Sequence, residues 1–553
     1  MVKRFIDVLH KEISGLHRAA YLLAFFSFLS QILALVRDRL LAHYFGAGTV
    51  LDLYYAAFRI PDFLFVSLGS MVSISVLVPF FIDRMAKSDN DGRRVIDEVF
   101  TFFSVLMVGA AVCTYFLAPY IIPRIFSGLQ GTADMAELIS YTRLLLWSPI
   151  LLGVSNFFAS ITQASRRFTA YALSPVLYNA GIIFGIIVLL PYFGLRGVLY
   201  GVIFGAVLHI GCQIPVLARD KFIPRITRIA NYSAVRSIFI LSIPRTLALA
   251  ASNLTALVLI AMASHMEQGS IAIFNLSLNL QSVPLTLVGV SYSIAAFPAL
   301  ASLFSSGKKS LFLEDIISAS RHIIFWALPI SVLFIVLRAQ IVRTILGSGA
   351  FSWEDTRLTA AALALFAISA VAQSLILLFV RGFYAAGKTK MPLLINTFSS
   401  LLIVVLAYLF LFISKSYAPI TDALEWLLRV SGIDGTAVLA LPLAFTIGSI
   451  VNAILLWVSF ERAFGSIFGR IHRMIFEISL ASIVVGAVSY VSLDIFDDIF
   501  NIDTALGIFS QGLFSGIFGI LFGVVILLSL RNRELSDIFT TLSERYKKIP
   551  PAL

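Results

Sequence analysis

The chain carries little charge for its length. Of its 553 residues, 13% are charged and 59% are hydrophobic, and the mean hydropathy is +0.95. A composition this apolar excludes a soluble globular protein. Cysteine is also scarce. Cys113 and Cys212 both lie inside apolar runs, so we expect inert packing residues that say little about the compartment.

The sequence also lacks the common patterns of catalytic and metal sites. Its seven histidines are scattered without the spacing of a metal site, and no Walker motif is present. We therefore expect no catalytic residues, no metal site, no cofactor and no ATP site of the chain's own. Any transport would then be driven by an ion gradient, by the membrane potential or by consumption of the substrate on the far side. The few candidate ion-binding groups are Asp38, Asp62 and Asn396.

Long apolar runs dominate what the sequence does contain. A helix needs roughly 20 apolar residues to cross about 30 Å of hydrocarbon. Fourteen such runs begin near residues 20, 55, 97, 138, 169, 197, 237, 269, 317, 357, 391, 436, 474 and 506. The sequence therefore predicts an all-α polytopic membrane protein with about 14 transmembrane helices. Its charged, amphipathic start runs straight into the first span, so we expect no cleavable signal sequence.

Lysine and arginine are distributed unevenly between alternate loops. Of the 41 basic residues, 29 lie at the two ends of the chain and in the even-numbered loops, whereas seven lie in the odd-numbered loops. By the positive-inside rule, both termini are predicted to be cytoplasmic. The net charge of +11 is therefore mainly a signal of topology, not of nucleic-acid binding. The five other basic residues lie inside spans: Arg37, Arg39, Arg59, Arg143 and Arg245.

An internal repeat relates the two halves of the chain. The stretch "SPVLYNAGIIFG", with Pro175 and Asn179, returns 217 residues later as "MPLLINTFSSLL", with Pro392 and Asn396. A second pair, "VSISVLVPFF" and "SYSIAAFPAL", is separated by 219 residues. Spans 1 to 6 therefore match spans 7 to 12. An even number of helices in each copy gives both copies one orientation, related by an axis along the membrane normal.

The repeat predicts how the chain is organised. Two six-helix lobes that face each other would enclose a central cavity, as in a transporter that alternates its access. The predicted parts are a cytoplasmic amphipathic N-terminus (1–19), an N-lobe (20–218), a cytoplasmic inter-lobe linker (219–236), a C-lobe (237–461), spans 13 and 14 (462–530) and a cytoplasmic tail (531–553).

Two buried cations mark a candidate cavity in the first two spans. Arg37 lies about eight residues before the end of the first span, and Arg59 lies about eight residues after the start of the second. At 1.5 Å per residue, both sit about 12 Å below the outer surface. The helix neighbours of Arg37 are Ala34 and Ser30, small and polar residues that fit a cavity wall better than a lipid face.

A structural role for these arginines stays open. Long basic side chains can reach the membrane interface, and an arginine can also pair with a carboxylate inside the bundle, here Asp38 or Asp52.

At these residues the sequence resembles a known family. The run "SQILALVRDRLLAHYFGAGTVLDLYYAAFRIPDFL", the run "VRGFYAAGKTKMPLLINT" and the fourteen-span layout are similar to the MurJ (MviN) lipid II flippases of the MOP exporter superfamily. The resemblance extends from the first span through the twelfth. It implies a V-shaped pair of lobes around a cationic cavity. It also implies that spans 13 and 14 form a groove for the polyprenyl tail of the substrate.

The sequence departs from this family at three places. Gln31 stands where family members commonly have an arginine, and residues 65–71 form a neutral stretch where a charged one is expected. The eighth span, which often bears an essential arginine, has Asn275, Asn279 and Gln281 instead. Arg245 lies about 12 Å in from the cytoplasmic side and follows Pro244, so we expect it to supply the missing cation. The predicted substrate-binding residues are Arg37, Asp38, Asp52, Arg59, Arg245, Asn275, Asn279 and Gln281.

The resemblance implies a function and its partners. We expect the chain to flip lipid II, the polyprenyl-pyrophosphate-linked peptidoglycan precursor, from the inner to the outer leaflet of the bacterial cytoplasmic membrane. The expected partners are this lipid or a similar one, the membrane and the cell-wall synthesis machinery, with no nucleic acid. Three alternatives stay open: a flippase for another polyprenyl-linked glycan, a MOP-type ion-coupled small-molecule exporter, and a membrane scaffold of a cell-wall assembly complex.

Overall fold

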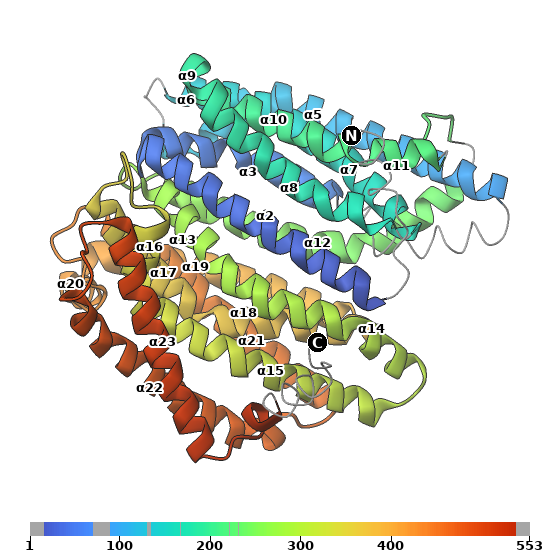
Figure 1. Cartoon of the computed structure of the whole chain (residues 1–553). Coiled ribbons are helices and arrows are strands. Elements are labelled where there is room, and N and C mark those ends of the chain that lie inside the picture. Colours follow the sequence, from blue (N-terminus) through green and yellow to red (C-terminus); the bar gives the residue numbers. More distant parts are fainter. Residues whose placement is uncertain are drawn as a thin grey trace, which may run out of the picture. The chain divides into compact units, whose positions relative to one another are not determined.

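The fold is all-α, as predicted. The computed structural model describes residues 16–69, 89–129, 134–165, 167–220, 222–229 and 232–537, and every regular element in these ranges is a helix. The chain divides into two compact units, Met1–Ala272 and Ile273–Leu553. The first unit holds the blue to green helices of Figure 1, and the second holds the green to red ones.

The first unit is a bundle in which α3 is central. This helix packs on α6, α7 and α12, while α2 packs on α8, and α5 packs on α7. The helices of this unit are α2 (Leu16–Phe45), α3 (Thr49–Gly69), α5 (Asp89–Ile125), α6 (Asp134–Leu145), α7 (Trp147–Ala164), α8 (Phe168–Phe184), α9 (Leu190–Phe193), α10 (Leu195–Gly211), α11 (Ile214–Arg219) and α12 (Tyr232–Ala263), with a π-helical turn at Gly185–Leu189.

Glycines let α8 and α10 touch backbone to backbone. A Cβ atom added to Gly181 would lie 2.3 Å from the Cα of Gly205, and one added to Gly185 would lie 2.5 Å from the Cα of Gly201. Membrane helices have little hydrophobic drive to associate, so small residues that allow close packing hold them together. These four glycines therefore fix α8, and with it the residues that α8 presents to α2.

The second unit holds the remaining helices. They are α13 (Ser270–Pro284, whose first turn belongs to the first unit), α14 (Ser291–Ser305), α15 (Lys309–Val336), α16 (Arg338–Ile345), α17 (Trp353–Ile368), α18 (Ala370–Ala385), α19 (Lys390–Ser416), α20 (Ala418–Leu428), α21 (Ala440–Phe464), α22 (Phe468–Asp497) and α23 (Ala505–Ser529). A π-helical turn at Leu285–Val290 joins α13 to α14. Within this unit α22 packs on α23 and α15, and α19 packs on α21.

An aromatic cluster forms the core of the second unit. Phe460 on α21 is fully buried, and its ring lies 5.2 Å from that of Phe383 and 5.4 Å from that of Phe379, both on α18. Phe312 on α15 and Phe464 complete the cluster. Aromatic side chains bury the largest apolar areas, so this cluster joins α15, α18 and α21.

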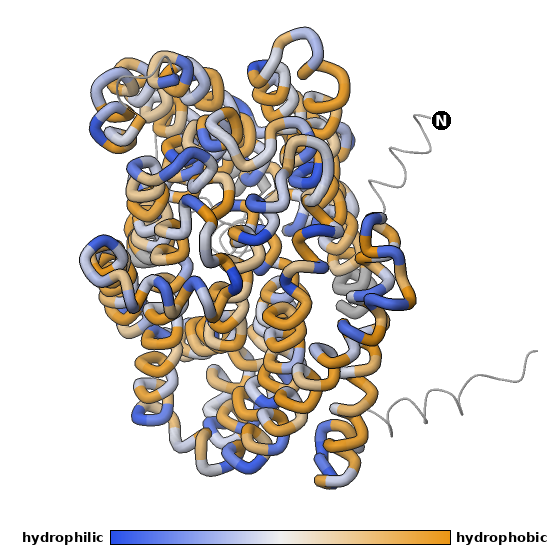
Figure 2. Tube along the Cα trace, turned by 90° about the vertical axis from the view of Figure 1, so that its left-hand side faces the viewer, coloured by the Kyte–Doolittle hydropathy of each residue, from blue (hydrophilic) through white to orange (hydrophobic). Residues whose placement is uncertain are grey.

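The helices agree with most of the predicted spans. Ten helical segments of the described residues are long and apolar enough to cross a membrane, or eleven if the pair α17 and α18, bent by 43°, is one span. The other three predicted spans fall on α2, α3 and α12, which carry charges or have a short apolar part. Figure 2 shows that hydrophobic residues dominate most of the helical trace. The total of fourteen stays a prediction.

The repeat predicted from the sequence has structural counterparts. Asn179 lies four residues after Pro175 in α8, and Asn396 lies four residues after Pro392 in α19. Each of these helices packs on a later helix of its own unit, α8 on α10 and α19 on α21. The connection that follows α8 and the one that follows α19 each contain a glycine with positive φ, 58° at Gly194 and 73° at Gly432. The second motif pair cannot be compared, because its first copy lies outside the described residues.

One helix boundary differs from the sequence-based expectation. The third span was expected to begin near residue 97, but α5 already begins at Asp89, and Asp97 and Glu98 are buried within the helix instead of solvated. The division between the compact units falls at Ala272, and α12 packs on α3 and α5 of the first unit. Residues 70–88, which precede α5, lie outside the described residues.

The predicted linker packs on the first unit. Residues 222–229 have no regular secondary structure. The Asp97 carboxylate of α5 accepts a hydrogen bond from the backbone N–H of Arg225 at 2.8 Å, and the Thr101 hydroxyl accepts one from that of Thr227 at 3.0 Å. This segment therefore runs along α5 with its backbone donors satisfied.

Candidate functional site

Arg37 lies at the centre of a polar network in the first unit. Its Nε and Nη2 donate to Oδ1 of Asp38 at 3.0 and 2.8 Å, and its Nη1 donates to Oδ1 of Asn179 on α8 at 3.1 Å. The side chain of Arg37 is 20% exposed, whereas that of Asp38 is 3% exposed. Of the two carboxylates that the sequence offered as partners, Asp38 is therefore the one that pairs with Arg37.

Asn179 orients this network. Its Nδ2 donates to Oγ of Ser30 on α2 at 3.1 Å and to the carbonyl oxygen of Pro175 at 3.2 Å. Because the amide nitrogen is committed to these acceptors, its oxygen faces Arg37. Three of the five N–H groups of a guanidinium are engaged in this way, and two are left as donors for another acceptor.

Three tyrosines surround the network. Tyr54 and Tyr55 on α3 are buried, and both interact electrostatically with Arg37. Tyr178, the residue before Asn179, interacts with Tyr54 and with Arg37. Phenol hydroxyls can donate and accept hydrogen bonds, so these side chains add neutral polar groups beside the cation.

Arg59 belongs to the same neighbourhood. It lies on α3 three residues before Asp62, and the two interact electrostatically, as Arg59 also does with Tyr55. Residues three apart share a helix face, so these two charges are adjacent. Helix α3 continues through Pro61, whose ring nitrogen cannot donate to the carbonyl of Ala57.

Asp52 has a different environment from the one expected of a cavity residue. Its two carboxylate oxygens accept hydrogen bonds at 2.7 Å from the backbone N–H groups of Gly269 and Ala272. A carboxylate at a helix N-terminus satisfies donors that have no partner within the helix. Asp52 therefore caps the start of α13 from α3, and its role in substrate binding stays a prediction.

The predicted inner half of the path lies on two further helices. Helix α12 is continuous through positions 244 and 245, but the side chain of Arg245 is outside the described residues. Asn275 and Gln281 on α13 are buried, and Asn279 is half-buried. The Nε2 atom of Gln281 is buried without a hydrogen-bond partner, which makes it a candidate donor for a ligand. Their role in substrate binding stays a prediction.

Sequence reasoning singled out the two arginines and Asp38 but missed the residues that hold them. Asn179 was noticed only as part of the repeat, and the three tyrosines carried no signal. A polar residue four positions after a proline, inside a long apolar helix, could have identified Asn179 as functional.

This arrangement defines a class of protein. Cations paired with partly buried carboxylates, inside a bundle of membrane-spanning helices, suit the binding of an anionic group that has to leave water. Within the described residues no group of three or more metal-ligating side chains occurs. The fold and the site are those of a multi-pass membrane transporter.

Comparison with known proteins gives the family. The family model "Lipid II flippase MurJ" matches residues 41–508, and the chain belongs to this family. A probable lipid II flippase MurJ of Thermotoga maritima is 27% identical over 465 residues, 84% of this chain and 88% of that protein. One of Bdellovibrio bacteriovorus is 26% identical and covers 79% of this chain and 81% of that protein.

Solved structures support the fold. A structure titled "Lipid II flippase MurJ, inward closed conformation" matches with a TM-score of 0.73 and 22% identity, covering 93% of this chain and all of that one. An inward-facing multidrug resistance MATE family transporter of the MOP superfamily matches with a TM-score of 0.63 and 15% identity, covering 78% and 94%. The helical fold of the chain is therefore similar to the folds of these two proteins.

Proposed function

We propose that this chain flips lipid II from the inner to the outer leaflet of the bacterial cytoplasmic membrane, and that Arg37 and Arg59 contact its pyrophosphate. Membership of the MurJ family supports the flipping function. The observation that carries the role of the site is the partly exposed side chain of Arg37, whose guanidinium keeps two N–H donors for a further acceptor.

The network explains how a phosphate could be bound out of water. Before a phosphate binds, Asp38 neutralises and orients the guanidinium of Arg37, because an unpaired buried cation would destabilise the protein. An arriving phosphate would engage the two remaining N–H groups and compete with Asp38 for the others. Arginine suits this exchange, since its planar fork binds phosphate bidentately and keeps its proton.

The polyprenyl tail would stay in lipid while the headgroup crosses. Helices α22 and α23 lie in the part of the chain predicted to form the tail groove, and α23 exposes many large apolar side chains, among them Phe509, Leu513, Ile517 and Leu521. Keeping the tail in hydrocarbon avoids the cost of exposing it to water, about 0.8 kcal/mol per CH₂ group.

Alternating access would come from movement of the predicted lobes, residues 20–218 and 237–461, with both termini in the cytoplasm. The repeat and the distribution of basic residues support this organisation. Contact with the cell-wall synthesis machinery is part of the proposal, because the product is used on the outer side.

Arg245 would supply the cation on the inner half of the path. An Arg245→Ala variant should then lose lipid transport while it still inserts, and Asn279→Arg should partly restore transport. Normal transport by Arg245→Ala would show instead that the inner path recognises its lipid through neutral donors such as Asn275, Asn279 and Gln281.

The function can be tested with purified protein in proteoliposomes that contain fluorescent lipid II. Arg37→Gln and Arg59→Gln should each abolish protein-dependent flipping. Arg143→Gln is a matched control, because this arginine also lies in a predicted span but stacks on Tyr115, with its Cζ 4.5 Å from the ring centre. Equal loss in all three variants would argue against a specific site.

A second measurement separates the remaining alternatives. Depletion of the protein in cells should cause lipid II to accumulate on the inner leaflet. In the vesicles, an excess of another polyprenyl-linked glycan should inhibit lipid II flipping only weakly. Strong competition, or unchanged lipid II on depletion, would instead favour a flippase for that other glycan.

A further inference from the structure

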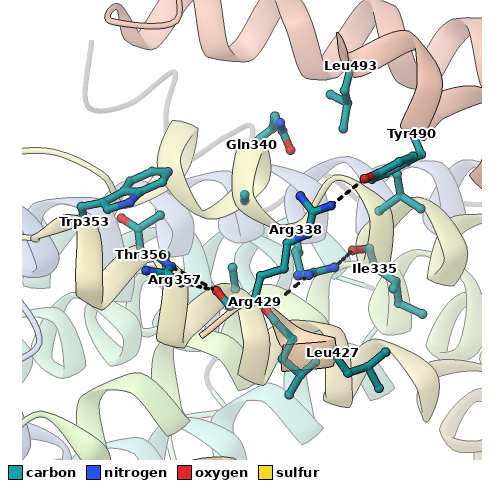
Figure 3. Close-up of a pocket in the computed structure, with 14 residues that line it drawn as sticks. Ile335, Arg338, Gln340, Trp353, Thr356, Arg357, Leu427, Arg429, Tyr490 and Leu493 are labelled. Carbon is teal, nitrogen blue, oxygen red and sulfur yellow. Dashed lines mark hydrogen bonds between the residues drawn. The ribbon is translucent and has the colours of Figure 1, made fainter. Parts of the chain in front are cut away.

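A second cluster of arginines lines a pocket in the second unit. Arg338 begins α16, Arg357 lies in the second turn of α17, and Arg429 directly follows α20 (Figure 3). Tyr490 of α22 closes another side. The pocket holds about 600 Å³, within the range of sites that bind small molecules.

These arginines have no carboxylate partner in the part of the chain that the structure describes. None of the three forms an ion pair there, whereas Arg321 and Arg473 of the same unit pair with glutamates. Arg338 donates to the carbonyl of Ile335 at 3.0 Å, and Arg357 donates through Nε to the carbonyl of Arg429 at 3.1 Å. These neutral acceptors hold the side chains in place but leave their charge uncompensated.

The charges are close enough to influence one another. Burial and the nearby guanidinium of Arg429 both lower the pKa of Arg338. Like charges held together in a partly buried site destabilise the folded protein unless a bound anion neutralises them. The pocket therefore has the electrostatics of an anion site.

The position of the cluster is unusual for this chain. Only seven of the 41 basic residues lie in the odd-numbered loops, which the positive-inside rule places outside. Arg338, Arg357 and Arg429 are three of these seven, and a fourth, Arg343, lines the adjoining pocket. Four of the seven predicted outer basic residues therefore line these two adjoining pockets.

Arg429 adopts a backbone conformation that favours glycine. Its φ and ψ are 60° and 42°, the left-handed region, at the end of α20. A residue with a Cβ atom is strained in this region relative to glycine. In this conformation the guanidinium donates to the hydroxyl of Tyr490 at 2.6 Å and so lies at the pocket.

Apolar residues form the rest of the pocket. Ile335, Leu427 and Leu493 are among its lining residues, and Leu427 is 66% exposed. Trp353 and Trp426 beside them are 56% and 76% exposed, as is typical of tryptophans at a membrane interface. Cations next to an apolar wall suit an amphiphile better than a free ion.

We propose that this pocket binds the phosphate or pyrophosphate head of a membrane lipid at the outer surface. Arg338 and Arg429 would bind the phosphate oxygens, Arg357 would hold the backbone of Arg429, and the first part of the tail would lie along the apolar wall towards α22. The proposal that the headgroup rests in this pocket after it has crossed the membrane depends on the proposed function. The proposal that the pocket binds a lipid phosphate does not depend on it.

The experiment uses the full chain in phosphatidylcholine nanodiscs. Arg37→Gln and Arg59→Gln are introduced together, so that the first site does not contribute to binding. Affinity is measured for farnesyl pyrophosphate, farnesol and inorganic pyrophosphate. We expect farnesyl pyrophosphate to bind at least tenfold more tightly than either of the others, because only it engages both the cations and the apolar wall.

Three further variants test the residues in this background. Arg338→Gln and Arg429→Gly should each weaken farnesyl pyrophosphate binding about tenfold or more. Glycine at 429 relieves the left-handed backbone, so this variant should fold at least as well as its parent. Lys415→Gln is the matched control, a predicted outer basic residue that does not line the pocket, and should bind normally.

The outcomes separate this inference from the proposed function. Unchanged farnesyl pyrophosphate binding in folded Arg338→Gln and Arg429→Gly variants would show that the pocket is not the binding site. Affinity for inorganic pyrophosphate equal to that for farnesyl pyrophosphate would show that the ligand of the pocket is not a lipid. Lipid II flipping by the unmodified chain is measured in parallel. If flipping is absent while binding depends on the pocket, the proposed function fails and the lipid phosphate site stands.

Discussion

Arg37 on α2 and Asn179 on α8 are joined by a hydrogen bond of 3.1 Å, although 142 residues separate them in the chain. The Asp38 carboxylate accepts two further hydrogen bonds from Arg37, so the guanidinium is held by partners on two helices. A cation fixed in this way needs little reorganisation when a phosphate arrives.

Loss of the Asn179 amide should therefore impair transport. We expect Asn179→Ala to lower the rate of lipid II flipping about tenfold or more, because a hydrogen bond to a charged group is removed. The matched control is Asn253→Ala, since this asparagine on α12 donates to the backbone carbonyl of Leu249 at 3.1 Å and not to a charged group. Flipping assays in proteoliposomes measure both. Equal effects would contradict a specific role for Asn179.

Asp52 should act mainly on stability. Asp52→Ala leaves two backbone N–H groups of the α13 start without their acceptor, which should cost about 1–3 kcal/mol and lower the melting temperature in detergent. Asp52→Asn keeps one acceptor oxygen, so its effect should be smaller. Asp434→Asn, in an exposed turn, is the control. A large loss of flipping by Asp52→Asn at an unchanged melting temperature would show a direct role in transport.

Close packing of α8 and α10 should not tolerate a larger residue. In Gly205→Ala the new Cβ would lie 2.4 Å from the carbonyl oxygen of Tyr178, so the helices have to separate. Overpacking of this kind costs about 1–3 kcal/mol, and it should also displace Asn179. Gly109→Ala meets no atom within 4 Å and should be neutral. Thermal unfolding and flipping assays compare the two variants.

The aromatic cluster should dominate the stability of the second unit. Phe460→Ala removes a fully buried ring and should cost about 3–5 kcal/mol, whereas Phe476→Ala removes a ring that is 67% exposed and should have little effect. Melting temperatures in detergent test this difference. Similar values for both variants would mean that the cluster contributes no more than lipid-facing rings.

The predicted orientation can be tested with cysteines at exposed positions. After replacement of both native cysteines, Ile226→Cys should react with a membrane-impermeant reagent only in broken cells, and Trp426→Cys should react in intact cells. Both positions are highly exposed, 78% and 76%, so reactivity reports sidedness and not burial. The reverse pattern would overturn the topology and the outer location of the arginine pocket.

The amino-acid sequence by itself determined the class, the helical content and the adjacent charges of this protein. A membrane span is a local property, because about 20 apolar residues are sufficient to cross the hydrocarbon. The repeat can also be found without the fold, since it needs only the comparison of one stretch of sequence with another. Arg37 and Asp38 are neighbours in the chain, so their pairing could be predicted without knowledge of the fold.

Only the tertiary structure decided which distant residues complete each site. Asn179 reaches Arg37 because glycines set the position of α8, and Asp52 meets Gly269 because α3 packs beside the start of α13. Arg338 and Arg429 lie 91 positions apart and share a pocket through the packing of α16, α17 and α20. Helix packing depends on many weak contacts summed over whole surfaces, so no local pattern in the sequence records it.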